Sequence, residues 1–181
     1  MNVVRTELAG VLIIEPRVFG DDRGFFYESY NEKAFAAATG VAPRFVQDNH
    51  SRSVKNVLRG LHYQIQQPQG KLVRATAGEV YDVVVDIRRS SPDFGKWTSV
   101  VLSADNKRML WIPAGFAHGF LVTSDYAEFQ YKTTDYWAPQ FERCILWNDP
   151  ELKIPWPLQA GPLLSAKDLQ GLPLSKAETF E

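Results

Sequence analysis

The stretch Val57-Leu58-Arg59-Gly60-Leu61-His62-Tyr63-Gln64 begins with two strand-forming residues. A cation, a glycine and a histidine come after them. In an extended chain alternate residues share a face, so His62 lies with Gly60 and Gln64, and Leu61 points to the opposite side. We expect the Leu61 side to pack against the core, and Gly60 to leave room for something to lie against the strand. A lone histidine in this setting is more often structural than functional, so its role depends on the rest of the chain.

Composition and charge exclude several classes of protein. Because the chain has 181 residues and 45% of them are hydrophobic, we expect one folded domain over residues 1–181. Twenty basic and 21 acidic residues give a net charge of −1, so we expect neither a nucleic-acid partner nor an anionic membrane. No apolar run reaches the roughly 18 residues of a membrane span, and the N-terminus lacks the layout of a signal peptide. Cys144 is the only cysteine, which fits a reducing compartment, and we predict a soluble cytoplasmic protein.

Short strands dominate the pattern from residue 57 onward. In the run 80–87, Val83 and Val85 alternate with Asp82 and Val84, which places the two sets on opposite faces. Similar runs recur at intervals of about 8–12 residues, and we expect roughly eight to ten strands with a single helix. This spacing predicts an all-β fold, a β-sandwich or barrel, rather than an α/β fold.

Other segments carry different signals. Residues 31–39 predict the helix, with Asn31 as its cap and Gly40 as its stop. The aromatic run 25–30 predicts a strand after a turn, whereas the run 47–52 is wholly polar. Such a polar run is typical of a solvated loop, although no glycine or proline explains a turn. Beyond residue 150 the chain is rich in proline, and we expect an ordered but irregular C-terminal tail.

A second histidine follows a sharp turn in the sequence Pro113-Ala114-Gly115-Phe116-Ala117-His118. The spacing Pro-x-Gly-x-x-His resembles the second motif of the cupin superfamily, in which this turn aims the histidine into a small β-barrel. Many cupins bind a metal through this histidine, together with two histidines and a glutamate of the first motif. Here the first motif offers only His62, with no nearby thiol and no matching acid, so we predict no bound catalytic metal.

Long, unusual strings over nearly the whole chain resemble one family of this superfamily, the metal-free dTDP-4-dehydrorhamnose 3,5-epimerases. They comprise residues 20–26, 45–51, 57–62, 69–74, 111–120, 126–132, 146–149 and 164–168. The resemblance implies a cupin-type jelly roll, or double-stranded β-helix, with a short helix and an irregular tail. It also implies a homodimer, no cofactor, and a dTDP-4-keto-6-deoxyhexose substrate that is inverted at carbons 3 and 5.

The chemistry of a 4-keto sugar explains the residues that the family uses. The carbonyl acidifies the hydrogens on carbons 3 and 5. Their inversion needs a base on one face, an acid on the other and positive charge near the enolate oxygen. The resemblance assigns the base to His62, its carboxylate partner to Asp168, the acid to Tyr131 and the cation to Lys71.

The residues alone leave other interpretations of these positions open. Asp82 and Asp86 are alternative buried carboxylates for the partner of His62. Tyr131 has the pattern of a strand tyrosine packed in the core. Lys71 has the pattern of a surface lysine that follows a turn.

The resemblance also implies a set of substrate contacts, which are Arg23, Glu28, Gln47, Asp48, Asn49, Arg59, Lys71, His118, Tyr136, Trp137, Glu142 and Lys167. We expect Arg23 and Arg59 to clamp the diphosphate, because a guanidinium binds phosphate through a bidentate fork. Tyr136 and Trp137 either stack on the thymine ring or pack in the core.

Other functions fit parts of the sequence. A metal-dependent cupin oxygenase requires the histidine pair that the first motif lacks. A non-catalytic module that binds sugar nucleotides would keep Arg23 and Arg59 but would have no use for His62 and Tyr131 together. A 3-epimerase or a ketoisomerase shares most of the motifs, and the sequence separates these relatives poorly.

Overall fold

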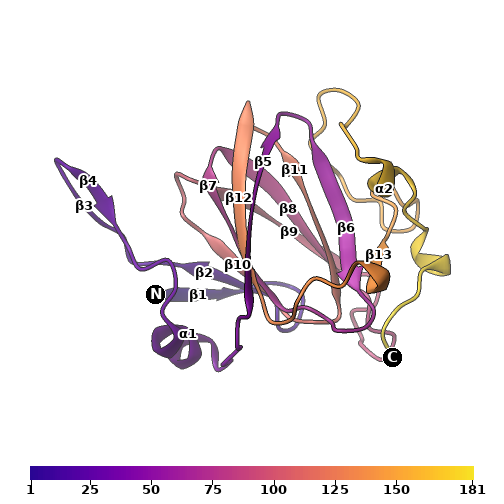
Figure 1. The fold of residues 1–181 in the computed structure, drawn as a ribbon, viewed down its shortest axis with the longest axis horizontal. Helices are drawn as coiled ribbons and strands as arrows, with labels where there is room; N and C mark the ends of the chain where they lie inside the picture. The colour runs from indigo at the N-terminus through magenta and orange to yellow at the C-terminus, as the bar shows by residue number, and fades with distance from the viewer.

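Two antiparallel sheets face each other and form a β-sandwich (Figure 1). The computed structural model describes residues 1–181. One sheet has six strands, in the spatial order β1 (Asn2–Arg5), β2 (Leu12–Glu15), β10 (Met109–Ile112), β7 (Lys71–Ala77), β12 (Tyr126–Thr133) and β5 (Gln47–Val54). The other has five, in the order β13 (Glu142–Cys144), β6 (Leu58–Gln64), β11 (Phe116–Val122), β8 (Glu79–Asp86) and β9 (Trp97–Ser103). The prediction of an all-β fold of the jelly-roll type is confirmed.

Apolar side chains from both sheets fill the space between them. Phe129 of β12 and Phe120 of β11 stack there, with ring centroids 4.3 Å apart. Val84 of β8 belongs to this inner core, whereas Val83 of the same strand packs in a cluster on the outer face. The two-residue alternation predicted for this strand is therefore confirmed, and it carries Asp82 to the inner side.

Helix α1 (Glu32–Thr39) packs on the outer face of the six-stranded sheet. It begins after Asn31, whose Oδ1 accepts a backbone hydrogen bond at 3.0 Å. It ends at Gly40, which has the left-handed φ of +73° that glycine adopts without strain. Phe35 is fully buried and meets Trp111 of β10 edge-on, with centroids 5.8 Å apart. The predicted helix and both of its terminal signals are confirmed.

The C-terminal tail packs on the outer face of the five-stranded sheet. Its helical parts are short, namely α2 (Ala166–Leu169) and the 3-10 turn η2 (Leu174–Lys176). Ile154, Trp156 and Leu174 of the tail lie in one buried cluster with the outward valines of β8. The tail is therefore ordered and irregular, as predicted. No helix in the structure is both long enough and apolar enough to cross a membrane.

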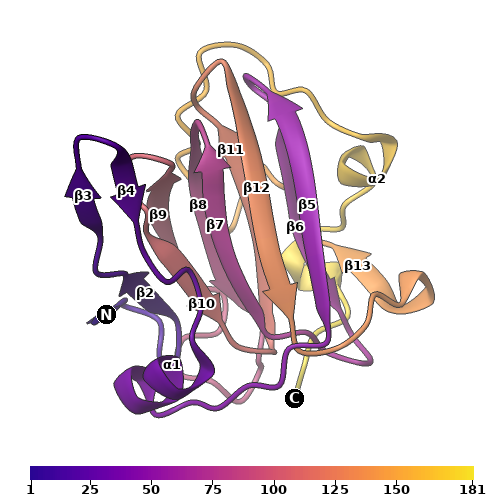
Figure 2. The same ribbon diagram turned by 60° about the vertical axis from the view of Figure 1, so that its left-hand side comes forward.

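Two segments differ from the expectation. The polar run 47–52 is not a loop but lies in β5, which pairs with β12 along its whole length. The aromatic run 25–30 leaves the strand conformation after Phe26, and its first residues belong to a small hairpin of β3 (Phe19–Asp21) and β4 (Gly24–Phe26). Figure 2 shows this hairpin projecting from the sandwich, on the side away from α2.

Candidate active site

A cleft of about 660 Å³ opens between the two sheets. Strands β5, β7 and β12 supply one wall and β6 and β11 supply the other, while α2 and the residues that flank the 3-10 turn η1 (Pro139–Phe141) form the rim. Eleven of the residues predicted from the sequence line this cleft: Gln47, Asn49, Arg59, His62, Lys71, His118, Tyr131, Trp137, Glu142, Lys167 and Asp168.

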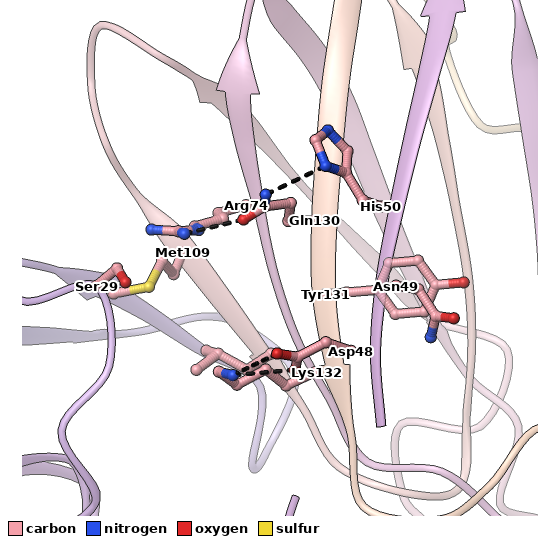
Figure 3. Close-up of a pocket in the computed structure, with 10 residues that line it drawn as sticks. Ser29, Asp48, Asn49, His50, Arg74, Met109, Gln130, Tyr131 and Lys132 are labelled. Atoms are coloured by element: carbon pink, nitrogen blue, oxygen red, sulfur yellow. Dashed lines mark hydrogen bonds and ion pairs between the residues drawn. The ribbon is translucent and has the colours of Figure 1, made fainter. Parts of the chain in front are cut away.

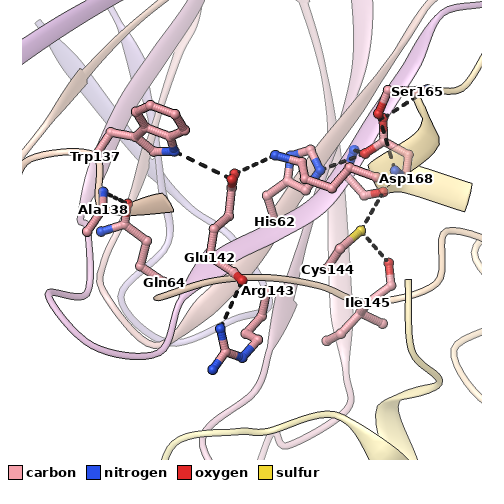
Figure 4. Close-up of polar contacts among 12 residues, drawn as sticks. His62, Gln64, Trp137, Ala138, Glu142, Arg143, Cys144, Ile145, Ser165 and Asp168 are labelled. Atoms are coloured by element: carbon pink, nitrogen blue, oxygen red, sulfur yellow. Dashed lines mark hydrogen bonds and ion pairs between the residues drawn. The ribbon is translucent and has the colours of Figure 1, made fainter. Parts of the chain in front are cut away.

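His62 and Asp168 form a hydrogen-bonded pair at one wall of the cleft (Figure 4). His62 Nε2 lies 2.6 Å from Asp168 Oδ1. The carboxylate also accepts hydrogen bonds from the Gly60 amide at 3.1 Å and the Ser165 hydroxyl at 2.6 Å. Ser165 and Asp168 form the capping box that starts α2, so this short helical turn holds the carboxylate in place.

The charges of this pair follow from burial and hydrogen bonding. Burial lowers the pKa of His62, although the hydrogen bond to Asp168 acts in the opposite direction. Burial alone would raise the pKa of Asp168, but hydrogen bonds from His62 and Ser165 outweigh it and lower that pKa to about 2. At neutral pH the pair is therefore a neutral imidazole beside a carboxylate. Because a carboxylate only accepts hydrogen bonds, Nε2 carries the ring proton and Nδ1 keeps the lone pair.

Asp168→Asn should move the acid limb of the pH profile of kcat/KM to lower pH. The Asp168 carboxylate raises the pKa of His62 against the effect of burial, so its loss lets that pKa fall further. We expect a displacement of roughly 1–3 pH units, the usual effect of one nearby opposite charge, together with a lower plateau rate. An acid limb that stays in place or moves to higher pH would show that another group titrates there.

A second histidine–carboxylate pair lies on the neighbouring strand. His118 of β11 is in register with His62 of β6, and its Nε2 lies 2.9 Å from Asp82. Asp86 instead pairs with an arginine outside the cleft. Of the three carboxylates considered from the sequence, Asp168 is the partner of His62, and Asp82 is the partner of His118.

Tyr131 and Lys71 lie on the wall opposite His62. Tyr131 belongs to β12 and packs partly against the inner core, while Lys71 is the first residue of β7. Burial raises the pKa of Tyr131, as does the Glu142 carboxylate, so the phenol keeps its proton at neutral pH. Burial lowers the pKa of Lys71 to about 8, while Glu142 acts in the opposite direction. Lys71 is thus not a surface lysine, and its ammonium has no ion-pair partner within the chain.

Lys71→Arg should remove the alkaline limb of the kcat/KM profile. If the ammonium stabilises negative charge in the cleft, activity of the unaltered protein falls as the pH rises through the Lys71 pKa of about 8. A guanidinium stays protonated at this pH. The maximal rate of the variant, whatever its value, should therefore persist to about pH 10. A limb near pH 8 in both proteins would assign the titration to another group.

An ion pair spans part of the rim of the cleft. Lys167 Nζ lies 2.7 Å from Glu142 Oε1, and the indole of Trp137 donates to Glu142 Oε2 at 3.4 Å (Figure 4). Burial opposes ionisation of Glu142, but the Lys167 ammonium outweighs it and lowers the pKa of the carboxyl. Three predicted substrate contacts therefore lie side by side.

Four predicted substrate residues do not line the cleft. Asp48 faces outward from β5, where it pairs with a lysine of β12 and lines an outer hollow of about 220 Å³ (Figure 3). Arg23 lies at the turn of the β3–β4 hairpin and pairs with a neighbouring aspartate, and Glu28 follows that hairpin. Tyr136 is 62% exposed, so the alternative of core packing is wrong for this residue. A single chain does not bring these four side chains to the His62 pair.

The structure also reveals neighbours that the sequence did not. Cys144 lies directly opposite His62 in the β13–β6 pairing, so the expectation that no thiol is nearby is wrong. Burial raises the pKa of this thiol to about 12, which keeps it protonated. The backbone of the adjacent strand lies against Gly60, as a Cβ there would be 2.5 Å from the Gly119 Cα. Of the residues that contact the His62–Asp168 pair, only Ser165 could be recognised from the sequence, because Ser-x-x-Asp is a signal for the start of a helix.

Comparison with known proteins gives consistent matches over the whole chain. The sequence model described as dTDP-4-dehydrorhamnose 3,5-epimerase matches residues 5–176. A dTDP-4-dehydrorhamnose 3,5-epimerase from Pseudomonas aeruginosa is 67% identical over 180 residues, which is 99% of each chain.

Solved structures agree with the sequence matches. A dTDP-6-deoxy-D-glucose-3,5-epimerase from Legionella pneumophila, in complex with dTDP-4-keto-L-rhamnose, has a TM-score of 0.95 and 54% identity, with 98% of this chain and 94% of that chain covered. A 3'-monoepimerase from Streptomyces bikiniensis, in complex with dTDP-quinovose, has a TM-score of 0.89 and 33% identity, with coverage of 97% and 88%. The fold, the cleft and these matches together show that the chain belongs to the dTDP-4-dehydrorhamnose 3,5-epimerase family.

Proposed function

We propose that the protein is a cofactor-independent epimerase that inverts carbons 3 and 5 of dTDP-4-dehydro-6-deoxy-D-glucose. The product would be dTDP-4-dehydro-L-rhamnose, a precursor in dTDP-L-rhamnose biosynthesis. One observation carries the proposal: a neutral histidine and a protonated tyrosine lie on opposite walls of one cleft. Membership of the family supports the substrate class.

The proposed reaction consists of two proton transfers at each carbon. His62 Nδ1 removes the hydrogen, and the C–H electron pair forms the double bond of an enolate whose charge moves to the oxygen on carbon 4. Lys71 stabilises that oxygen, while the Asp168 carboxylate stabilises the imidazolium. Tyr131 then delivers its proton to the opposite face, and the ketone re-forms with inverted configuration. The imidazolium loses its proton to solvent, and the phenolate regains one.

Arg59 is the proposed anchor of the diphosphate within the cleft. Its Nε donates to Ser53 Oγ at 3.1 Å, and its terminal nitrogens have no hydrogen-bond partner in the chain. Arg59→Ala should weaken dTDP binding by about 1.5–3 kcal/mol, the usual contribution of a hydrogen bond to a charged group. Calorimetry measures the change, and Arg52→Ala serves as the control because Arg52 stacks on Tyr126 at the outside of the sheet. A Kd unchanged by Arg59→Ala would remove this residue from the nucleotide site.

One experiment separates the proposal from an oxygenase and from a single-inversion enzyme. Protein stripped of metals by exhaustive chelation is incubated with the 4-keto substrate, and NMR determines the configuration at carbons 3 and 5. We expect both carbons to be inverted at the rate seen before chelation. Inversion of carbon 3 alone would identify a 3-epimerase. Loss of turnover that iron, zinc or manganese restores would contradict cofactor independence.

The proposal includes a single domain over residues 1–181, a cytoplasmic location and a homodimer. Phe25 and Phe26 support the dimer, because they are 64% and 67% exposed on the projecting hairpin. Burial of such aromatic surface against a second chain removes it from water. A dimer would also offer a place for Arg23 and Glu28, which lie outside the cleft of their own chain. A monomer in analytical ultracentrifugation would contradict this part of the proposal.

A further inference from the structure

Three side chains with different donor atoms meet at the back of the cleft. A ring nitrogen of His62, Sγ of Cys144 and a carboxylate oxygen of Asp168 all lie within 4.8 Å of one another. The β13–β6 pairing sets Cys144 opposite His62, and α2 supplies Asp168 (Figure 4). The Cys144 thiol contacts the carbonyl oxygens of Gly60 and Ile145 at 3.5 Å, and a thiol is only a weak hydrogen-bond donor. No strong hydrogen bond therefore holds its proton.

This donor set suits a divalent cation that favours sulfur. Zn²⁺ takes nitrogen, sulfur and oxygen ligands in a tetrahedron with bonds of about 2.0–2.3 Å, which sets the ligand atoms roughly 3.3–3.7 Å apart. The longest separation must therefore close by no more than roughly 1.5 Å, and the 2.6 Å contact between His62 and Asp168 must open slightly. Small side-chain rotations provide movements of this size.

The charges of the site also match a divalent cation. A thiolate and the Asp168 carboxylate supply two negative charges, and the third ligand is a neutral imidazole. The cation whose charge acts on both His62 and Cys144 is the Lys167 ammonium, which is paired with Glu142 at 2.7 Å. The assembled site would therefore be close to neutral in its half-buried position.

We propose that His62, Cys144 and Asp168 bind one Zn²⁺-like cation, with water from the cleft as the fourth ligand, and that this binding inhibits the enzyme. The thiol proton passes to solvent when the metal–sulfur bond forms. With the metal on His62 Nε2 the ring proton lies on Nδ1, so neither nitrogen keeps a lone pair for the substrate. The inhibition rests on the proposed function, whereas the metal binding does not.

Cobalt(II) tests the site without substrate and without any substitution. A thiolate bound to Co²⁺ gives a charge-transfer absorption, and Cys144 is the only cysteine in the chain. We expect one Co²⁺ per chain with this absorption, its displacement by Zn²⁺, and no binding of Mg²⁺, which prefers oxygen ligands. Absence of the absorption at saturating Co²⁺ would overturn the proposal.

Variants then separate the binding of the metal from inhibition. Cys144→Ala should lose the absorption and weaken Zn²⁺ binding by at least about tenfold in calorimetry. His50→Ala should keep both, because His50 lies on the outer face beside Glu128. Zn²⁺ should inhibit the unaltered protein reversibly, relative to its metal-free rate, and inhibit Cys144→Ala much less. Equal inhibition of the two proteins, or binding of Zn²⁺ with unchanged turnover, would overturn the inhibitory role. If no protein turns the substrate over, the proposed function fails while the cobalt result still decides the site.

Discussion

His62→Asn should abolish deuterium exchange and inversion together, with turnover lower by about 10²–10⁴ or more. The buried Asp168 carboxylate keeps its hydrogen bonds from the Gly60 amide and the Ser165 hydroxyl, whereas the shorter asparagine amide reaches only the position of Nδ1 and not that of Nε2. The asparagine has no basic nitrogen, however, and no other group takes the hydrogen from the sugar. Both processes are measured in one experiment by NMR of the substrate in deuterated water.

A matched control uses a histidine on the outer face of the other sheet. His50 lies on the outer face of β5, where its Nε2 is 3.0 Å from Glu128. His50→Asn should therefore exchange and invert the substrate at the unaltered rate. Exchange that persists in His62→Asn would identify a different base, and His118 is then the first candidate, because it lies in register beside His62.

Tyr131→Phe should separate exchange from inversion. Phenylalanine keeps the ring and its packing beside Phe129, with centroids 6.3 Å apart in the unaltered protein, but it has no hydroxyl. His62 can still remove the hydrogens, so exchange with deuterated solvent should persist. The inverted product should fall by about 10²–10⁴, because the proton returns mostly to the face that it left.

The control for this variant lies on the same strand. Tyr126 begins β12, is 40% exposed and stacks with Arg52 outside the cleft. Tyr126→Phe should leave the ratio of exchange to inversion unchanged. Formation of inverted product at the full rate by Tyr131→Phe would mean that water or another acid supplies the second face, and Tyr131 would then have only a packing role.

Local sequence patterns predicted the elements that bury apolar side chains. The helix at 32–39 has both terminal signals, and β8 alternates between the inner core and the outer cluster. Strand β5 shows where such patterns fail, because both of its faces are polar. Asn49 and Ser51 line the cleft, whereas Asp48 and His50 line the outer hollow. Hydrophobic alternation cannot detect a strand that lies between a substrate cleft and solvent.

The spacing of residues also left the partners of the two histidines undecided. Asp168 lies 106 positions from His62, and the capping box of α2 brings it there, so only the family resemblance pointed to it. The contact of Cys144 with His62 depends on the register of β13, a three-residue strand with no hydrophobic pattern of its own. The sequence of a short strand without a hydrophobic pattern does not specify its register against a strand that is distant in the chain.

The labelling of carbons 3 and 5 with solvent hydrogen tests the proposed proton transfers most directly. Unaltered protein that has been stripped of metals with a chelator is incubated with dTDP-4-keto-6-deoxyglucose in deuterated water. NMR then follows both carbons. We expect each carbon to gain one deuterium as it inverts, because Tyr131 and His62 exchange their protons with solvent. An inverted product that keeps its original hydrogens at carbons 3 and 5 would contradict the transfer of protons between His62, the substrate and Tyr131.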